Sequence, residues 1–347
     1  MTILISIVSK QTIPNILFIK EKQAEVDKFL FVNTEYTLKG KFSERIKTVC
    51  GIAEEDCVNV KVVEDNVMDV IQQIRLKFEE HRLFDYTRFL VNVTGGTKPM
   101  ALGVYTFFEK KINNAEFYYI TFPKSNQYQR LYDDCPPEYY DLNYRIPLKD
   151  YLLAYGFSID TIQTDLFKDF EYTKKLALMP VKDAIAEIKQ YVQKGMEEKA
   201  QRYYQYNGYL EEYIYTVFKT QLGLADDCIG LSVKTLQPLV DDGEISDHEL
   251  DVIFTYENQL YVIECKVGPP NPFENTVFKL FSIKQRIGFC HGYIAMLKPL
   301  REEGKLPIFV TKKAKPSGII VLDGTDIKEE AGLLNAIQQI KNKHHTS

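Results

Sequence analysis

A regular alternation of strand-like and helix-like segments over residues 1 to about 122 most constrains the fold of this chain. Apolar runs typical of strands occur at residues 3–8, 29–32, 58–63, 88–93 and 116–122. Between them, helical patterns are expected just after Pro14 and at residues 38–49, 67–80 and 99–111. Strands that alternate with helices form a mostly parallel sheet covered on both faces. The sequence therefore predicts an α/β, Rossmann-like doubly wound domain at residues 1–145.

Polar segments follow the first, second and fourth of these strands. In an open α/β sheet, ligands bind beyond the carboxyl ends of the strands, so these segments predict a ligand site. The candidate binding residues after the first two strands are Gln11, Thr12, Asn15 and Thr34.

The segment after the fourth strand, Thr94-Gly-Gly-Thr-Lys-Pro-Met100, gives the strongest indication of a ligand. Paired glycines let the backbone approach a ligand closely, and free N–H groups at a helix start form an anion site together with Lys98. The candidates here are Thr94, Gly95, Gly96, Thr97 and Lys98. The segment matches neither the Walker A nor the dinucleotide-binding pattern. A tight strand-to-helix turn without a ligand is the simpler alternative.

A second feature is the segment 249–266, which reads as two apolar strands joined by a tight turn. If Glu257 and Asn258 form a two-residue loop, Asp251 stands opposite Glu264. Two facing carboxylates repel each other unless something positive lies between them, and a divalent cation is the obvious candidate. Lys266 projects on the same face as Glu264, because side chains alternate along a strand.

This combination suits the hydrolysis of a phosphodiester. Carboxylates of Asp251 and Glu264 would hold Mg²⁺ or Mn²⁺, and Lys266 would orient the attacking water or stabilise the charged transition state. An exposed hairpin face that simply carries charges is the alternative, because 26% of the residues are charged.

The second domain is expected at residues 201–347, after a helical connector at residues 146–200 with helices at 148–155, 161–175 and 181–196. A helix over residues 207–218 places Glu211 beside its apolar stripe and turns Glu212 away from it. Glu211 is therefore the candidate for an additional catalytic carboxylate. A solvated acidic edge explains the same residue equally well.

Composition limits the possible partners. The net charge is −5, so only a local basic surface can attract nucleic acid, and basic residues are concentrated between 279 and 315. The six cysteines lack metal-ligand spacing, so we expect them to be reduced. Without a membrane-spanning run or a signal-like leader, a cytoplasmic protein is predicted.

Two family resemblances rest on these residues. Asp251, Glu264 and Lys266 resemble the PD-(D/E)XK nuclease signature, although the proline of that motif is absent, and the helix with Glu211 resembles one that adds a carboxylate to many such sites. The segments 94–100 and 11–15, with Thr34-Glu35, are similar to CRISPR-associated Rossmann-fold (CARF) domains.

Together the resemblances imply a two-domain CARF nuclease of type III CRISPR antiviral defence. Such a protein is a homodimer that binds a cyclic oligoadenylate, here cyclic tetra-adenylate, and then cleaves DNA or RNA with a metal ion. Two alternatives stay open: a sensor whose nuclease fold is silent, and a constitutive restriction-type endonuclease.

Overall fold

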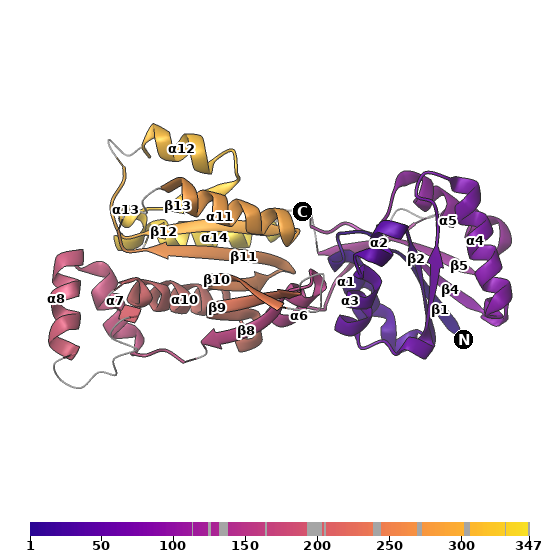
Figure 1. Ribbon diagram of the computed structural model, residues 1–347, viewed down its shortest axis with the longest axis horizontal. Coiled ribbons are helices and arrows are strands. Elements are labelled where there is room, and N and C mark those ends of the chain that lie inside the picture. The colour runs from indigo at the N-terminus through magenta and orange to yellow at the C-terminus, as the bar shows by residue number, and fades with distance from the viewer. Residues whose placement is uncertain are drawn as a thin grey trace. The chain divides into compact units, whose positions relative to one another are not determined.

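The chain in the computed structural model divides into two units, each built around its own sheet (Figure 1). Unit 1 comprises residues 1–146 and 153–156, and unit 2 comprises residues 147–152 and 157–347. The structure describes all residues except 113, 124–125, 132–137, 164, 193–202, 205, 239–243, 269–272, 302–305, 330 and 346–347. Cys135 and the end of the predicted connector, from residue 193, therefore lie outside the described residues.

The sheet of unit 1 has the strand order β3-β2-β1-β4-β5-β6-β7. Its first five strands pair in parallel, and β6 and β7 add antiparallel pairs. The strands are β1 (Thr2–Ile7), β2 (Lys28–Asn33), β3 (Cys57–Lys61), β4 (Arg88–Asn92), β5 (Ala115–Ile120), β6 (Gln127–Leu131) and β7 (Tyr139–Asp141). The predicted doubly wound, Rossmann-like sheet is confirmed. Its strand order reverses at β1, between β2 and β4.

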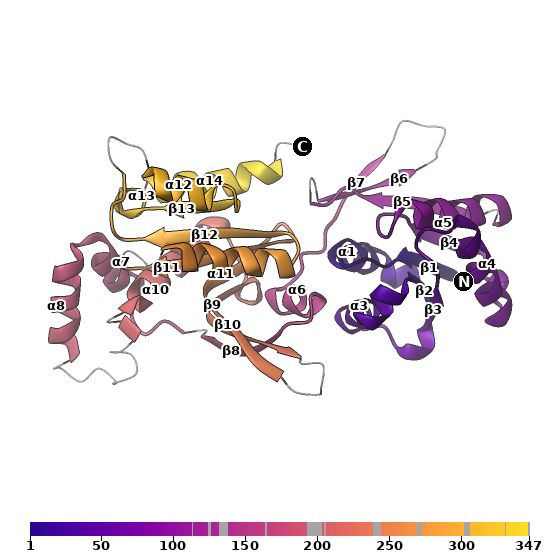
Figure 2. The same ribbon diagram turned by 45° about the horizontal axis from the view of Figure 1, so that its top comes forward.

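Helices cover both faces of this sheet, with α1 and α3 on one side and α4 and α5 on the other (Figures 1 and 2). They are α1 (Ile13–Lys22), α2 (Glu35–Lys39), α3 (Phe42–Cys50), α4 (Val67–Glu80) and α5 (Lys98–Lys111). The single helix predicted at 38–49 is wrong: Lys41 has a left-handed φ of 54°, which ends one helix and starts the next.

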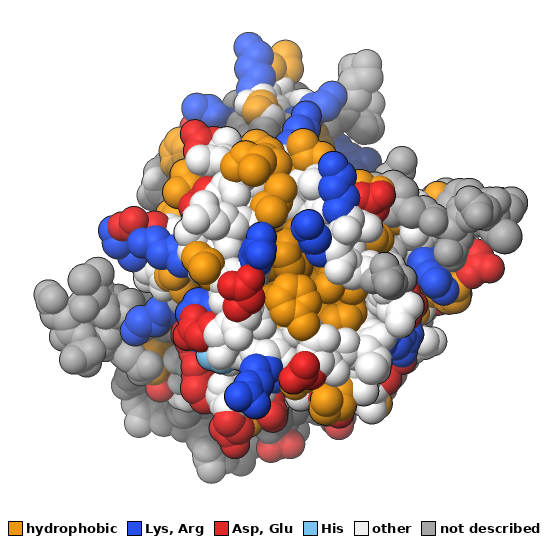
Figure 3. Space-filling model, turned by 90° about the vertical axis from the view of Figure 1, so that its right-hand side faces the viewer, with side chains coloured by type: hydrophobic (Ala, Val, Ile, Leu, Met, Phe, Trp, Pro, Cys, Tyr) orange, Lys and Arg blue, Asp and Glu red, His pale blue; other side chains and the backbone are white. Residues whose placement is uncertain are grey.

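Apolar side chains gather near the middle of the face that Figure 3 shows, among lysines, arginines and acidic residues. The exposed large hydrophobic residues of unit 1 include Met68 and Leu76 on α4 and Leu102 on α5, and Met68 is 70% exposed. Single exposed apolar side chains are common on protein surfaces, whereas a contiguous group of them marks a contact surface.

The sheet of unit 2 has the order β13-β12-β11-β10-β9-β8. Pairing is parallel from β11 to β13 and antiparallel from β8 to β11. The strands are β8 (Ser158–Gln163), β9 (Ile229–Pro238), β10 (Glu244–Tyr256), β11 (Gln259–Lys266), β12 (Cys290–Met296) and β13 (Ile319–Leu322). The helices are α6 (Leu148–Ala154), α7 (Phe170–Leu178), α8 (Val181–Val192), α10 (Gly208–Leu222), α11 (Phe273–Arg286), α12 (Ile308–Ala314), α13 (Gly324–Lys328) and α14 (Ala331–His345).

Two faces of this sheet bury different helices. Helices α10, α13 and α14 share one hydrophobic cluster with Val252, Phe254 and Ile263. Helix α11 lies on the other face, where a Cβ added at Gly292 would lie 3.6 Å from Leu280. The sheet is therefore a rigid, doubly covered platform for side chains at its strand ends.

The helix predicted over residues 161–175 is wrong. Residues 158–163 instead form β8, which pairs antiparallel with β9, and the helix begins only at Phe170. Ser158–Gln163 is mostly polar and has no buried residue, which suits an irregular edge strand that pairs on one side only.

No helix in the described part of the chain combines the length and apolar character that a membrane crossing requires. The five described cysteines, Cys50, Cys57, Cys228, Cys265 and Cys290, are free thiols.

Candidate functional site

The β10–β11 hairpin has the predicted register. Observed pairs run from Tyr256 opposite Gln259 to Val252 opposite Ile263, and the next position along both strands brings Asp251 opposite Glu264. The turn residues Glu257 and Asn258 both have left-handed φ values, 47° and 60°. Two such residues form the tight turn whose twist suits a two-residue hairpin.

Side chains at the end of this hairpin form a charged cluster. The Cys265 N–H donates to Asp251 Oδ2 at 2.7 Å, which holds the Asp251 carboxylate against β11. Lys266 Nζ lies 2.7 Å from Glu264 Oε1 and 3.6 Å from Asp251 Oδ2. Asp251 and Glu264 are both buried, so their charges act in a poorly screened environment.

A second lysine, which the sequence analysis did not single out, completes the cluster. Lys279 on α11 places its Nζ 2.6 Å from Glu264 Oε2, so both oxygens of Glu264 contact an ammonium group. Lys279 belongs to the basic stretch 279–315, but nothing in its spacing distinguishes it from its neighbours. Its partner is fixed by the packing of α11 on the sheet.

Glu211 enters the same neighbourhood from α10. The Tyr203 hydroxyl donates to Glu211 Oε2 at 2.9 Å. Burial raises the pKa of Glu211 to about 8, and the negative charge of Asp251 adds to the shift. Glu211 is therefore close enough to Asp251 to be influenced by its charge.

Burial and neighbouring charges also shift the pKa values of Asp251 and Lys266. Burial, and after it the charge of Glu264, raises the pKa of Asp251 to about 6. Burial alone would lower the pKa of Lys266, but Asp251 and Glu264 outweigh it and raise that pKa above its ordinary value. The lysine therefore stays charged, while the carboxylates gain from any added positive charge.

These residues fit a hard divalent cation by their donor chemistry. Carboxylate oxygens are the ligands that Mg²⁺ and Mn²⁺ prefer. Burial, and after it the charge of Glu264, makes the ionised form of Asp251 costly, and a bound cation would lower that cost. Among the described residues, no three His, Cys, Asp or Glu side chains already stand in metal-binding geometry. A cation at Glu264 would share that carboxylate with its two lysine contacts.

The basic stretch 279–315 is not one continuous positive surface. Lys284 donates to the carbonyls of Ser317 and Gly318, and Arg301 pairs with Asp323 and Asp326. Lys298, Lys312, Lys313 and Lys315 are exposed, whereas Lys305, Glu302 and Glu303 lie outside the described residues.

In unit 1, the loops after β1 and β4 are tied together at the point where the strand order reverses. Asn15 Nδ2 donates to the Ile7 carbonyl at 3.0 Å, and Asn92 Nδ2 donates to Asn15 Oδ1 at 3.2 Å. Thr94 Oγ1 donates to Asn92 Oδ1 and accepts from the Ile120 N–H. Asn15 and Thr94 thus fix the loops that carry the other candidates.

Close packing explains both glycines of this loop. A Cβ at Gly95 would lie 2.1 Å from the Ile7 carbonyl oxygen, and one at Gly96 would lie 2.3 Å from Ile7 Cγ2. Gly96 also has a left-handed φ of 74°. The loop therefore needs both glycines for its own structure, whether or not it binds a ligand.

The other candidates differ in how far they reach solvent. Thr97 caps α5 by accepting from the Met100 N–H, and Thr97 and Lys98 are exposed. Gln11 is partly exposed and accepts from the Tyr155 hydroxyl at 2.7 Å. Two are buried: Thr12 donates to the Ala154 carbonyl, and Thr34 caps α2.

Comparison with known families agrees with this geometry in both units. Residues 3–151 match the Card1 CARF domain model, and residues 197–324 match the Card1-like endonuclease domain model. The chain is therefore a fusion of a CARF domain with a nuclease domain. The CARF domain matches the Card1 family model, and the nuclease domain matches the Card1-like endonuclease model.

Solved structures share the fold. The crystal structure of protein VC1899 from Vibrio cholerae is 15% identical, with a TM-score of 0.80 over 99% of each chain. Can2 from Sulfobacillus thermosulfidooxidans, solved in complex with cyclic tetra-adenylate, is 18% identical, with a TM-score of 0.70 over 97% of this chain and 96% of that one. The curated protein sequences gave no match.

Proposed function

We propose that this protein is a metal-dependent nuclease activated by a cyclic oligoadenylate, and that it acts in type III CRISPR defence. The observation that carries the proposal is the cluster of Asp251, Glu264 and Lys266 at the end of the hairpin, with Glu211 beside it. The endonuclease family match of residues 197–324 supports it. We assign sensing to residues 1–145 and cleavage to residues 201–347.

Asp251 and Glu264 would hold Mg²⁺ or Mn²⁺. When bound, the ion supplies positive charge that polarises the phosphate and favours deprotonation of the attacking water. The Lys266 ammonium, kept charged by its two carboxylate neighbours, faces the same space and stabilises negative charge on the phosphate oxygens as the bond breaks. Glu211, tied to Tyr203, would complete the carboxylate set around the ion.

In the sensor domain, the loops at the reversal of strand order form the proposed messenger site. Lys98 and the first N–H groups of α5 supply positive charge for a phosphate, while Gln11 and Thr97 offer polar contacts. Thr12, Asn15, Thr34 and Thr94 shape the loops, and Gly95 and Gly96 let the backbone come close. The complex of Can2 with cyclic tetra-adenylate supports that ring as the messenger.

A homodimer would give a symmetric ring two equivalent binding surfaces. The exposed apolar side chains of α4 and α5 support such a contact. Activation then follows if the messenger binds one dimer arrangement more tightly than another.

Two variants test the catalytic assignment. Glu264→Gln and Lys266→Ala should abolish cleavage of nucleic acid and leave messenger binding intact, because both residues lie in unit 2. Glu274→Gln and Lys189→Ala, the latter an exposed lysine of α8, are matched controls of the same charge that should cleave normally. Cleavage that survives both site variants contradicts the proposal.

The alternatives predict different results in the same assay. A silent sensor binds the messenger and shows no cleavage even in the wild type. A constitutive endonuclease cleaves at a rate that the messenger does not change.

A further inference from the structure

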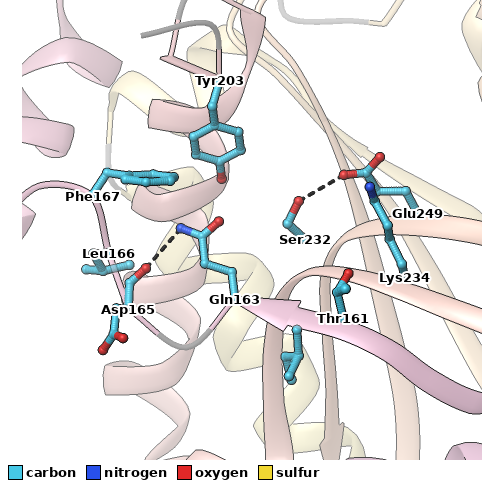
Figure 4. Close-up of a pocket in the computed structure, with 10 residues that line it drawn as sticks. Thr161, Gln163, Asp165, Leu166, Phe167, Tyr203, Ser232, Lys234 and Glu249 are labelled. Carbon is cyan, nitrogen blue, oxygen red and sulfur yellow. Dashed lines mark hydrogen bonds between the residues drawn. The ribbon is translucent and has the colours of Figure 1, made fainter. Parts of the chain in front are cut away.

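A cavity of about 560 Å³ lies in unit 2 (Figure 4). Its walls come from β8, β9 and β10, from the loop after β8, and from Tyr203. Nothing in the proposed chemistry uses this space. Its size is in the range of pockets that hold small organic groups.

Strand register connects this cavity to the candidate catalytic residues. Glu249 pairs with Lys234, and both line the cavity. Asp251 lies two residues after Glu249 on β10, and so on the same face. Its neighbours Leu250 and Val252 pair with Val233 and Leu231, which flank Ser232 on β9. Ser232 also lines the cavity, and its hydroxyl donates to Glu249. A nucleotide whose phosphate lies at Asp251 would therefore extend its neighbouring base toward this cavity.

Tyr203 provides a second connection. Its ring lines the cavity, and its hydroxyl donates to Glu211 at 2.9 Å. The ring is thus fixed relative to the catalytic carboxylates. An occupant stacked on Tyr203 would be held at a defined distance from them.

Aromatic side chains give the cavity an apolar wall. The rings of Phe167 and Tyr203 lie 5.4 Å apart and are tilted by 53°. Both rings are partly exposed. Nucleobases stack on aromatic side chains of this kind, independently of strand sequence.

Hydrogen-bond acceptors face the cavity opposite these rings. Gln163 Nε2 donates to the Asp165 carbonyl at 2.9 Å and to Glu212 Oε1 at 3.4 Å, so the amide orientation is fixed. Its oxygen points toward the space beneath Tyr203 (Figure 4). With the Glu249 carboxylate at the rim, the wall offers acceptors for an amino group, while Lys234 supplies a cation for a phosphate.

We propose that this cavity binds the base of a nucleotide next to the cleaved phosphodiester, in a single strand, and that it favours bases with an exocyclic amino group. This assignment rests on the proposed nuclease function and extends it to substrate choice. Adenine, cytosine and guanine carry such an amino group, whereas thymine and uracil do not. Single strands are required because a paired base is not free to stack on a side chain.

The test measures binding and cleavage separately, with the full-length protein. The substrates are fluorescently labelled single-stranded DNA and RNA oligonucleotides with one variable position. That position carries A, C, G, T (in DNA) or U (in RNA), or it is an abasic site. Binding is measured with EDTA, and cleavage is measured with Mn²⁺ and cyclic tetra-adenylate. The proteins are wild type, Phe167→Ala, Gln163→Leu and the control Asp160→Asn, which lies on β8 outside the cavity.

We expect Phe167→Ala to weaken binding of base-containing strands by about 5- to 150-fold, the range of one lost base stack, and to leave abasic strands unaffected. Gln163→Leu should remove the preference for amino-bearing bases, and Asp160→Asn should behave as wild type. Thermal unfolding of each variant identifies any loss of fold, and Gln163→Leu then tests the site independently of Phe167.

Two results separate the two proposals. In the first, wild type binds strands in a base-dependent manner, Phe167→Ala abolishes that dependence, and no protein cleaves. This result would support the base site and reject the nuclease function. If wild type cleaves, and Phe167→Ala and Gln163→Leu show the same preference among bases as wild type, the base site is overturned. The proposed nuclease function is then retained.

Discussion

The Lys279 ammonium lies 2.6 Å from Glu264 Oε2, on the carboxylate that we propose as a metal ligand. An ammonium and a divalent cation compete for the same oxygen, because each neutralises the same charge. We therefore expect Lys279→Met to tighten Mn²⁺ binding by about tenfold, the lower end of what one charge-assisted hydrogen bond contributes, because the Lys279 side chain is partly exposed. Isothermal titration calorimetry with Mn²⁺ measures this directly.

Lys298→Met is the matched control, since Lys298 is an exposed lysine in the same unit. Its Mn²⁺ affinity should equal that of wild type. Weaker binding in Lys279→Met would mean that Lys279 supports the ligand geometry rather than competing with the metal.

The sensor assignment predicts a difference between the two ends of α5. Lys98 begins this helix, where the N–H groups and the lysine act together on an anion, while Lys111 ends it. Lys98→Ala should weaken binding of cyclic tetra-adenylate by about tenfold or more, the effect of one charged phosphate contact. Lys111→Ala should bind it as wild type does. Equal affinities for the two variants would remove the helix start from the site.

Packing predicts the effect of a methyl group at Gly95. The added Cβ would lie 2.1 Å from the Ile7 carbonyl oxygen, so the β1 end or the loop must move. Such overpacking costs about 1–3 kcal/mol of unfolding free energy. We expect Gly95→Ala to lower the midpoint of thermal unfolding, whereas Gly268→Ala, with no atom within 4 Å of the added Cβ, should not. Unchanged unfolding of Gly95→Ala would contradict the observed loop packing.

Glu212 makes a prediction about pH. Burial raises its pKa above the ordinary value, although Tyr204, the Phe167 N–H and Gln163 donate hydrogen bonds to it. A carboxyl that binds its proton more tightly in the folded state stabilises the fold at pH below about 4.5, its unfolded value. That contribution disappears as the pH rises through the raised folded-state pKa.

A glutamine at position 212 has no ionisable group, so it makes no pH-dependent contribution to stability. The unfolding free energy of wild type minus that of Glu212→Gln should therefore decrease as pH rises from about 4 to about 8. Chemical denaturation at several pH values measures the difference. A difference that stays constant with pH would show that Glu212 is ionised without penalty.

Local sequence patterns correctly predicted the structure where residues close together in the sequence determine it. The positions Glu257 and Asn258 define a two-residue turn, and that turn alone fixes which residues face each other across β10 and β11. The same holds for the parallel sheet of unit 1, because each strand and the helix after it are contiguous in sequence. Both predictions are confirmed.

Local sequence patterns did not predict the structure of segments that depend on contacts with distant parts of the chain. The segment 158–163 forms a strand only because the edge of β9 is available to pair with it. Glu212, predicted to turn away from the core, is buried because the loop after β8 folds over α10 and donates a backbone N–H to it.

Lys279 and Tyr203 illustrate the same limit at the candidate site. Each reaches a carboxylate from a separate helical segment, so neither has a sequence spacing that links it to Asp251 or Glu264. Only the packing of helices on the sheet brings them there.

The most direct test of the central claim is cleavage of labelled single-stranded DNA and single-stranded RNA by the purified protein. Four conditions are compared: no addition, Mn²⁺ alone, cyclic tetra-adenylate alone, and both together. We expect cleavage only when metal and messenger are both present. Equal cleavage with Mn²⁺ in the presence and absence of the messenger would contradict it.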